Sequence, residues 1–261
     1  RSAATRIAPH VRRTPTIEAN AVAKPITPAR LMFKLVSMQA SGSFKARGAT
    51  NKLLSMPPGA TDRGIVTASG GNHGLAVARA ARLAGVHSTI FVPENITPGK
   101  VERLKGWGAA VEIIGQVWNE TNVHALRMAE ETGAAYFHPF ADAAVVAGQG
   151  TAALELLEDV PDLDTVLVAI GGGGLISGMG VAIKALKPSV RIIGIEPEGS
   201  PTLKASLDAG HVVRLDAVTS RVATMSCAET DQQVFETVRS VVDDVILLYD
   251  DEMLEASRWL W

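Results

Sequence analysis

The chain has 261 residues, of which 47% are hydrophobic and 20% are charged, and its formal net charge is -2 at pH 7. This composition is typical of a globular protein with a large core, and it gives no electrostatic reason to expect binding of nucleic acid or of an anionic membrane. The only cysteine, Cys227, excludes an intrachain disulfide and a cysteine cluster for zinc. No apolar run has the length of a membrane span, and residues 1–15 lack the apolar core of a signal peptide, so we expect a cytoplasmic enzyme.

One lysine in the stretch QASGSFKARGA, residues 39–49, follows a small, hydroxyl-rich turn and precedes good helix formers. One interpretation is a capped helix start, in which Ser43 is the N-cap and Lys45 lies in solvent. Lysine is rarely buried, so this stretch alone favours that interpretation. The alternative is a lysine used in chemistry, and it depends on the rest of the chain.

From residue 64 onwards, short apolar runs alternate with longer segments of helical character. We predict strands over 64–69, 88–93, 111–115, 135–139, 164–170, 190–197 and 243–250. We predict helices over 72–85, 99–109, 118–134, 145–160 and 175–188, and a final helix after residue 250. This alternation indicates an α/β fold with parallel sheets, and the unbroken apolar strand 164–170 is expected to be buried on both faces. No flexible linker is present, so any second domain must be an insertion.

The first of two unusual turns is TASGGNHG, residues 67–74, between a strand and a helix. Small residues let backbone N–H groups approach an anion, and the N-terminus of the helix favours negative charge. Asn72 and His73 add side-chain donors. An ordinary turn with Asn72 as N-cap is the alternative, since asparagine is a common N-cap.

The second turn is AIGGGGLISG, residues 169–178, with four consecutive glycines between a strand and a helix. Four glycines are costly to order, so packing alone is a strained explanation, and a nest of amides around a phosphate is a better one. A dinucleotide site is also conceivable, with Glu196 on the ribose. However, the glycine fingerprint for such a site is broken, because its third position is Ile176 or Ser177.

Taken together and in this order, SGSFKARGA, SGGNHG and GGGGLISG resemble the pyridoxal-phosphate enzymes of the tryptophan synthase β fold, known as fold type II. Within that group the chain most resembles the serine/threonine dehydratase family. The resemblance extends to HPF (138–140), AGQGTAALEL (147–156) and IGIEPEG (193–199). It implies two open, twisted, mostly parallel sheets with flanking helices, and the cofactor in a cleft between two domains.

The resemblance also implies domain boundaries. A smaller domain, 58–142, is expected to be inserted into a larger cofactor-binding domain formed by 1–57 and 143–261. The larger domain is expected to be incomplete at its C-terminal end, where relatives place the final strands and the partner of the pyridine nitrogen.

Site roles follow from the same resemblance. Lys45 is expected to hold pyridoxal 5'-phosphate as a Schiff base and later to remove the Cα proton of the substrate. Phe44 is expected to pack on the pyridine ring, and Asn72 to donate to the ring hydroxyl. The phosphate is expected to be cradled by the loop Gly171, Gly172, Gly173, Gly174 and Leu175. The substrate is expected to be bound by Ser69, Gly70, Asn72 and His73.

The implied reaction is the α,β-elimination of water from L-threonine, L-serine or a related β-hydroxy amino acid, which yields a 2-oxo acid and ammonia. The resemblance also implies a homodimer or homotetramer. We expect no metal ion. Metal-binding relatives have a glutamate followed six residues later by an aspartate; this chain has Glu196 at the first position but Thr202 at the second, and one carboxylate is a poor site for a hard cation.

Three alternatives to this reaction remain open. The first is a serine racemase-like enzyme, although related racemases place a serine immediately after the position of Ser69, where this chain has Gly70. The second is a nicotinamide-dependent oxidoreductase that uses the loop 171–174. The third is a catalytically silent relative, because Ser220 and Arg221 stand where the family usually has Asp-Gly. Arg221 would contact a second carboxylate or a ring edge, or it is a solvated loop residue.

Overall fold

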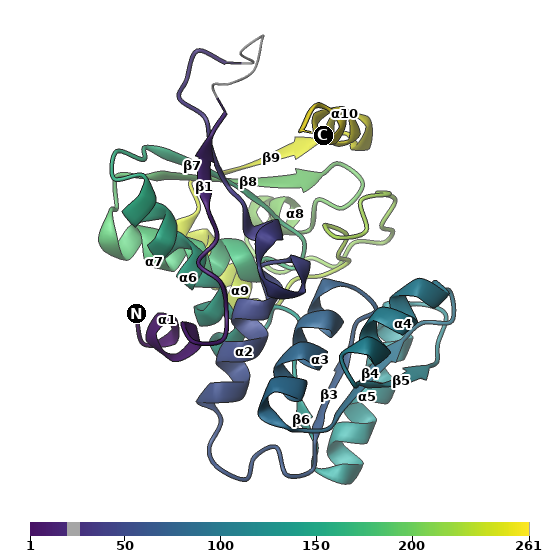
Figure 1. Ribbon diagram of the computed structural model, residues 1–261. Coiled ribbons are helices and arrows are strands. Elements are labelled where there is room, and N and C mark those ends of the chain that lie inside the picture. Colours follow the sequence, from purple (N-terminus) through teal and green to yellow (C-terminus); the bar gives the residue numbers. More distant parts are fainter. Residues whose placement is uncertain (20–26, 261) are drawn as a thin grey trace. The chain divides into compact units, whose positions relative to one another are not determined.

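The computed structural model describes residues 1–19 and 27–260 of the chain (Figure 1). The chain forms two compact units. Unit 1 consists of Arg1–Phe137 and Leu154–Pro161, and unit 2 of His138–Ala153 and Asp162–Trp261. Residues 1–57 fall in unit 1 because helix α2 (Lys45–Ser55) packs on helix α3 (Asn72–Ala84). An inserted domain with the boundaries 58–142 stays a prediction.

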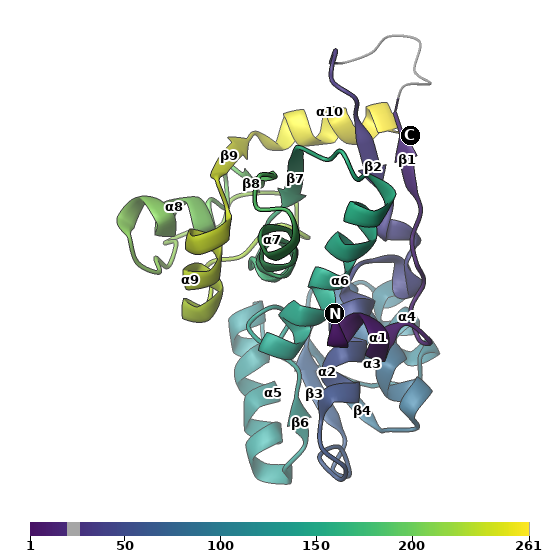
Figure 2. The ribbon, with the colours of Figure 1, turned by 90° about the vertical axis from the view of Figure 1, so that its left-hand side faces the viewer.

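Unit 1 contains a four-stranded parallel sheet in the order β5-β4-β3-β6. Its strands are β3 (Ile65–Ala68), β4 (Ser88–Val92), β5 (Ala110–Ile113) and β6 (Ala135–Tyr136). The connecting helices are α3, α4 (Pro98–Gly106) and α5 (Trp118–Thr132). Figure 2 shows α3 on one side of this sheet and α5 on the other. The sheet is therefore doubly wound, as the alternation of strands and helices predicts.

Close packing of α3 on the sheet explains its alanine-rich sequence. Every residue of β3 is buried, and most of the buried side chains of α3 are alanines. At Gly74 an added Cβ would lie 2.0 Å from the carbonyl oxygen of Ser69, so only glycine lets the helix start this close to the end of the strand. The helix ends at Gly85, which has a left-handed φ of 67°.

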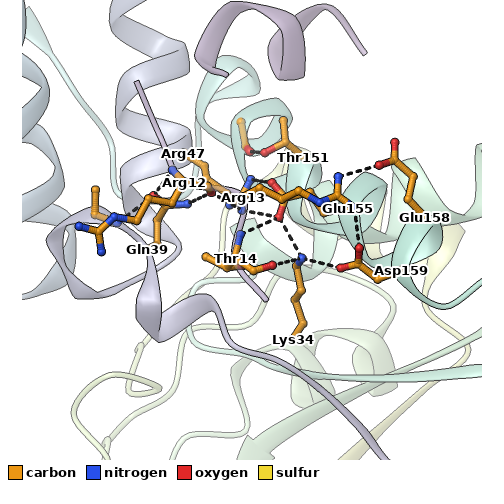
Figure 3. A network of polar contacts seen from close by, with 12 residues as sticks. Arg12, Arg13, Thr14, Lys34, Gln39, Arg47, Thr151, Glu155, Glu158 and Asp159 are labelled. Atoms are coloured by element: carbon orange, nitrogen blue, oxygen red, sulfur yellow. Dashed lines mark hydrogen bonds and ion pairs between the residues drawn. The ribbon is translucent and has the colours of Figure 1, made fainter. Parts of the chain in front are cut away.

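The N-terminal part of unit 1 is built from short elements: α1 (Ser2–Ile7), β1 (Thr16–Glu18), β2 (Met32–Lys34) and the 3-10 turns η1 (Val36–Met38) and η2 (Ala40–Gly42). β1 and β2 pair antiparallel. None of these elements was predicted, because runs of three to six residues carry too little periodicity to be recognised. Polar side chains hold this region together (Figure 3).

Unit 2 contains a three-stranded parallel sheet in the order β7-β8-β9. Its strands are β7 (Thr165–Ala169), β8 (Arg191–Pro197) and β9 (Asp244–Leu248). Its helices are α7 (Gly174–Leu186), α8 (Thr202–Ala209), α9 (Gln232–Val241) and α10 (Asp250–Leu260). Helix α6 (Ala143–Asp159) is divided between the two units. Figure 1 shows α7 and α9 on one side of the sheet.

The predicted strands and helices are all present, and the parallel pairing is confirmed in both sheets. One expectation about burial is wrong. In β7, Val166 and Val168 are buried beneath the helices, but Leu167, on the other face, is 60% exposed. The Leu167 face of β7 is therefore exposed in the part of the chain that the structure describes. None of the described helices is long and apolar enough to cross a bilayer.

Candidate active site

Lys45 is the first residue of α2 and lies directly behind a tight turn. In this turn Ser41 and Gly42 have left-handed φ values of 69° and 83°. Ser43 is buried, and its Oγ accepts the backbone N–H of Lys45 at 3.3 Å. Lys45 is half-buried, and its Nζ lies 5.3 Å from the centre of the Phe44 ring. Ser43 thus binds the helix start, but the N-cap of α2 is Phe44 and not Ser43 as predicted. A fully solvated Lys45 does not fit the structure.

The turn between β3 and α3 presents small polar groups at the carboxyl end of the parallel sheet. Ser69 Oγ accepts the N–H of Gly71 at 3.3 Å. The helix begins at Asn72 without a side-chain cap, so the N-cap interpretation of Asn72 is wrong. Among the described residues the half-buried Asn72 side chain has no hydrogen-bond partner, and the first N–H groups of α3 have no acceptor within the helix. This end of α3 therefore has the donors that an anion requires.

His73 points into unit 1. Its side chain is 2% exposed, and Nε2 lies 3.0 Å from the carbonyl oxygen of Phe137. A carbonyl oxygen only accepts, so Nε2 carries the proton. Thr67 Oγ1 donates to the same oxygen at 2.6 Å. The imidazole thus ties α3 to the segment that follows β6, and a contact between this ring and a substrate stays a prediction.

Gly70 has no room for a side chain without movement of a neighbour. An added Cβ would lie 2.7 Å from Ile96 Cδ1 and 3.6 Å from Val92 Cγ1. A side chain at this position would therefore require the end of the Ile96 side chain to move.

In unit 2, the loop 171–174 leads from β7 to the N-terminus of the 13-residue helix α7. Gly173 has a φ of 89°, which favours glycine. An added Cβ would lie 2.2 Å from the Phe140 ring at Gly172 and 2.6 Å from Val234 at Gly173. Packing therefore does require glycine here, contrary to the sequence argument. The consecutive amides at a helix N-terminus nevertheless fit a phosphate, so both demands act on the loop.

The segment that follows Ser220 and Arg221 braces this loop, and neither Thr224 nor Thr230 was predicted as a site residue. Thr230, which is 5% exposed, donates from Oγ1 to the carbonyl oxygen of Gly172 at 3.2 Å. An added Cβ at Gly171 would lie 3.3 Å from the carbonyl oxygen of Thr224. No sequence signal marks these contacts, because threonine is common in loops and its partner is remote in the chain.

The unusual pair Ser220 and Arg221 binds the start of α10. Ser220 Oγ donates to Asp250 at 2.8 Å, and Arg221 Nη2 donates to Asp251 at 2.6 Å. The Arg221 side chain is 71% exposed. Arg221 is thus a surface residue whose charge is balanced within unit 2.

Glu196 caps helix α8. It is fully buried, and its two carboxylate oxygens accept the N–H groups of Leu203 and Lys204, each at 2.8 Å. Burial raises the pKa of Glu196 to about 7, although the backbone hydrogen bonds oppose this shift. Because the Glu196 side chain is fully buried and turned toward α8, the ribose contact on which the nicotinamide alternative depends is contradicted.

The buried carboxyl predicts an unusual pH dependence of stability. Because the pKa of Glu196 is higher in the folded chain than the ordinary value of 4.5, protonation favours folding. Its contribution is complete below pH 4.5 and is lost as pH rises through about 7, with a slope of about 1.4 kcal/mol per pH unit. We expect Glu196→Gln to flatten this slope in urea unfolding measured from about pH 5 to about pH 8. Equal slopes in both proteins would contradict the assignment.

Comparisons with known proteins find similar enzymes over nearly the whole chain. A family model described as pyridoxal-phosphate dependent enzyme matches residues 7–261. Serine racemase of Oryza sativa subsp. indica is 38% identical over an alignment of 263 positions, which covers 99% of this chain and 76% of that protein. L-threonine ammonia-lyase of Thermotoga maritima is 38% identical over 241 residues, 92% of this chain and 60% of that protein. The crystal structure of the T.th. threonine deaminase matches with a TM-score of 0.93 at 37% identity, over 99% of this chain and 84% of that one.

Proposed function

The chain belongs to the pyridoxal-phosphate dependent enzyme family, and on this basis we propose that it is an ammonia-lyase for L-threonine, L-serine or a related β-hydroxy amino acid. Enzymes of this family use pyridoxal 5'-phosphate, so the predicted cofactor and fold type II are confirmed, and the nicotinamide alternative is wrong. The proposed products are a 2-oxo acid and ammonia. A homodimer or homotetramer and a cytoplasmic location stay predictions.

The described residues fit this cofactor in each unit taken by itself. When bound, pyridoxal phosphate supplies an aldehyde that links to an amine and a ring that takes up the electron pair of the substrate α-carbon. In unit 1 we assign the linking amine to Lys45, with Phe44 beside the ring. In unit 2 we assign phosphate binding to the amides of 171–175 and the N-terminus of α7.

Lys45 has two proposed tasks. Its Nζ holds the cofactor until the substrate amine takes its place, and the freed amine then accepts the proton from the substrate α-carbon. The β-hydroxyl leaves with the bonding electron pair and takes up the proton held by Lys45 Nζ, so that water forms. The unsaturated amino acid that is released is then hydrolysed by water to the 2-oxo acid and ammonia. Ser69 and Asn72, with the amides at the start of α3, are assigned to the substrate carboxylate. For His73 we propose the backbone amide as the donor, since its ring is buried.

The observation that carries the choice of a lyase is the lack of a second acid or base at Gly70. Racemisation needs a proton donor on the face of the α-carbon opposite Lys45. Gly70 has no side chain, and Ile96 fills the adjoining space. Serine racemase activity is the second candidate, because the rice serine racemase and the Thermotoga maritima L-threonine ammonia-lyase have the same sequence identity to this chain, 38%.

We expect L-serine and L-threonine to give 2-oxo acid without appreciable D-isomer. Chiral chromatography of the amino acid and a parallel assay of 2-oxo acid test this. The variant Gly70→Ser with Ile96→Val restores a hydroxyl and makes room for it, so its D-isomer should rise above the wild-type level. If the wild-type enzyme forms D-isomer as fast as 2-oxo acid, the lyase assignment gives way to a racemase.

A further inference from the structure

Arg47 is the bulkiest of the fully buried side chains, with 1% exposed. Its guanidinium donates two parallel hydrogen bonds to the Glu155 carboxylate, Nη1 to Oε1 at 2.6 Å and Nη2 to Oε2 at 2.8 Å (Figure 3). Nη2 also donates to the backbone carbonyl of Arg12 at 3.2 Å. All three residues lie in unit 1. The first turn of α2, which begins with Lys45, is therefore fixed at Arg47 to two other segments of the unit.

Gln39 fixes the chain on the other side of Lys45, before the turn that leads into α2. It is 2% exposed, and its Oε1 accepts the N–H groups of Arg12 and Ala40, each at 2.8 Å. Its Nε2 donates to the carbonyl oxygen of Arg12 at 2.6 Å. The backbone of Arg12 is thus bound from both sides of Lys45, by Gln39 before it and by Arg47 after it.

The chain between these two anchors is strained. Ser41 has a φ of 69°, and it is the one residue other than glycine with a positive φ in the part of the chain that the structure describes. Such a conformation persists only when the surroundings over-determine it, and strain of this kind gathers at functional sites. The bonds of Gln39 and Arg47 supply that restraint.

The ionised form of Glu155 is stabilised by a second cation, Lys34. Lys34 Nζ lies 2.9 Å from Oε2 of Glu155 and 3.1 Å from Asp159 (Figure 3). Burial alone would raise the pKa of Glu155, but the hydrogen bonds from Arg47 and Lys34 outweigh it and lower the pKa. Glu155 therefore stays ionised, and the two-point bond to Arg47 persists over the working pH range.

From these contacts we propose that Gln39 and Arg47 are positioning residues, which hold the turn 39–47 so that the amine of Lys45 is presented to the cofactor. Neither residue is assigned a contact with cofactor or substrate. The inference rests on the proposed role of Lys45 and adds two residues that act through it. The competing explanation is a purely structural ion pair, since truncating one member of a buried pair commonly destabilises a fold.

Two variants and a matched control separate these explanations. Arg47→Lys keeps the positive charge but cannot make the two parallel hydrogen bonds to Glu155. Gln39→Met keeps the volume and loses all three hydrogen bonds. Arg13→Lys is the control, because Arg13 belongs to the same network through Glu158 and Asp159 but is 53% exposed and bonds to neither Gln39 nor the turn.

The experiment adds pyridoxal phosphate to each cofactor-free protein and follows the visible absorption of the Lys45 adduct, well below the melting temperature of each variant. We expect both variants to load the cofactor about 10- to 100-fold more slowly than wild type, because small misplacements of a reacting group cost about that much. We also expect the pH midpoint of the visible band to shift. Arg13→Lys should load like wild type.

The outcomes test the role of Lys45 and the roles of Gln39 and Arg47 separately. If the wild-type protein develops no visible band, the proposed role of Lys45 fails. If wild type loads and both variants load at the same rate with the same pH midpoint, even with lowered melting temperatures, the pair is purely structural and the inference is overturned. If Arg47→Lys does not fold, the uncharged Gln39→Met variant decides.

Discussion

Replacing Lys45 by alanine is expected to abolish 2-oxo acid release while the fold survives. The amine of Lys45 is assigned both the attachment of the cofactor and the transfer of the α-proton, and removing a general base alone costs roughly 10²–10⁴-fold. Alanine is a good helix former, and Lys45 is only half-buried at the first position of α2, so the helix should persist. The assay measures 2-oxo acid from L-threonine and L-serine, with circular dichroism of the same sample.

The matched control for this variant is Lys52→Ala. Lys52 lies on the same helix and is also half-buried, with its Nζ 6.0 Å from the centre of the Phe137 ring. It is not assigned to the site, so its replacement should leave turnover near the wild-type level. If Lys45→Ala retains activity close to that of Lys52→Ala, Lys45 has no part in the mechanism.

Replacing Gly172 by valine is expected to weaken cofactor binding by about 100-fold or more. An added Cβ would lie 2.2 to 2.5 Å from atoms of the Phe140 ring, so the loop must move and its amides must leave the phosphate. Each hydrogen bond to a charged group is worth about 1.5–3 kcal/mol. Every loss of about 1.4 kcal/mol raises Kd tenfold. Titration of the cofactor-free protein with pyridoxal phosphate measures this Kd.

Gly171→Ala is the control for the glycine loop. Gly171 does not have a positive φ, and the nearest atoms to an added Cβ lie 3.3 Å away or farther, so the loop can accept a methyl group with little movement. Its Kd should change far less than that of Gly172→Val. Unchanged Kd in both Gly172→Val and Gly173→Val would show that the phosphate is bound elsewhere.

The sheet architecture could be predicted because it depends on short-range signals. Strand β3 is an apolar run bounded by glycines, and helix α3 is an alanine-rich run that ends at Gly85. Helix α9 was missed although its signal is present, since Asp231 Oδ1 accepts the N–H of Gln233 at 2.8 Å as an N-cap. The exposed side of Leu167 could not be predicted, because burial depends on which elements cover each face.

The candidate site shows the same division. The glycine loop and the turn before Lys45 are local patterns. The sequence therefore predicts that the loop lies between β7 and α7 and that the turn lies before the first residue of α2. The partners of Arg47 and Gln39 are remote in the chain, and no periodicity connects them. Glu196 was considered as a ligand residue because it lies at the end of strand β8, yet it binds the helix that begins a few residues later. The hydrogen-bond partners of these three side chains could therefore not be predicted from the sequence.

The most direct test of the central claim is peptide mapping of the holoenzyme after borohydride reduction. Reduction fixes the cofactor to the amine that carries it, and mass spectrometry of the peptides locates that amine. We expect the visible absorption band to be lost and a phosphopyridoxyl group to be found on the peptide that contains Lys45. A reduced group on another lysine, or a colourless protein in which no peptide is labelled, would contradict it.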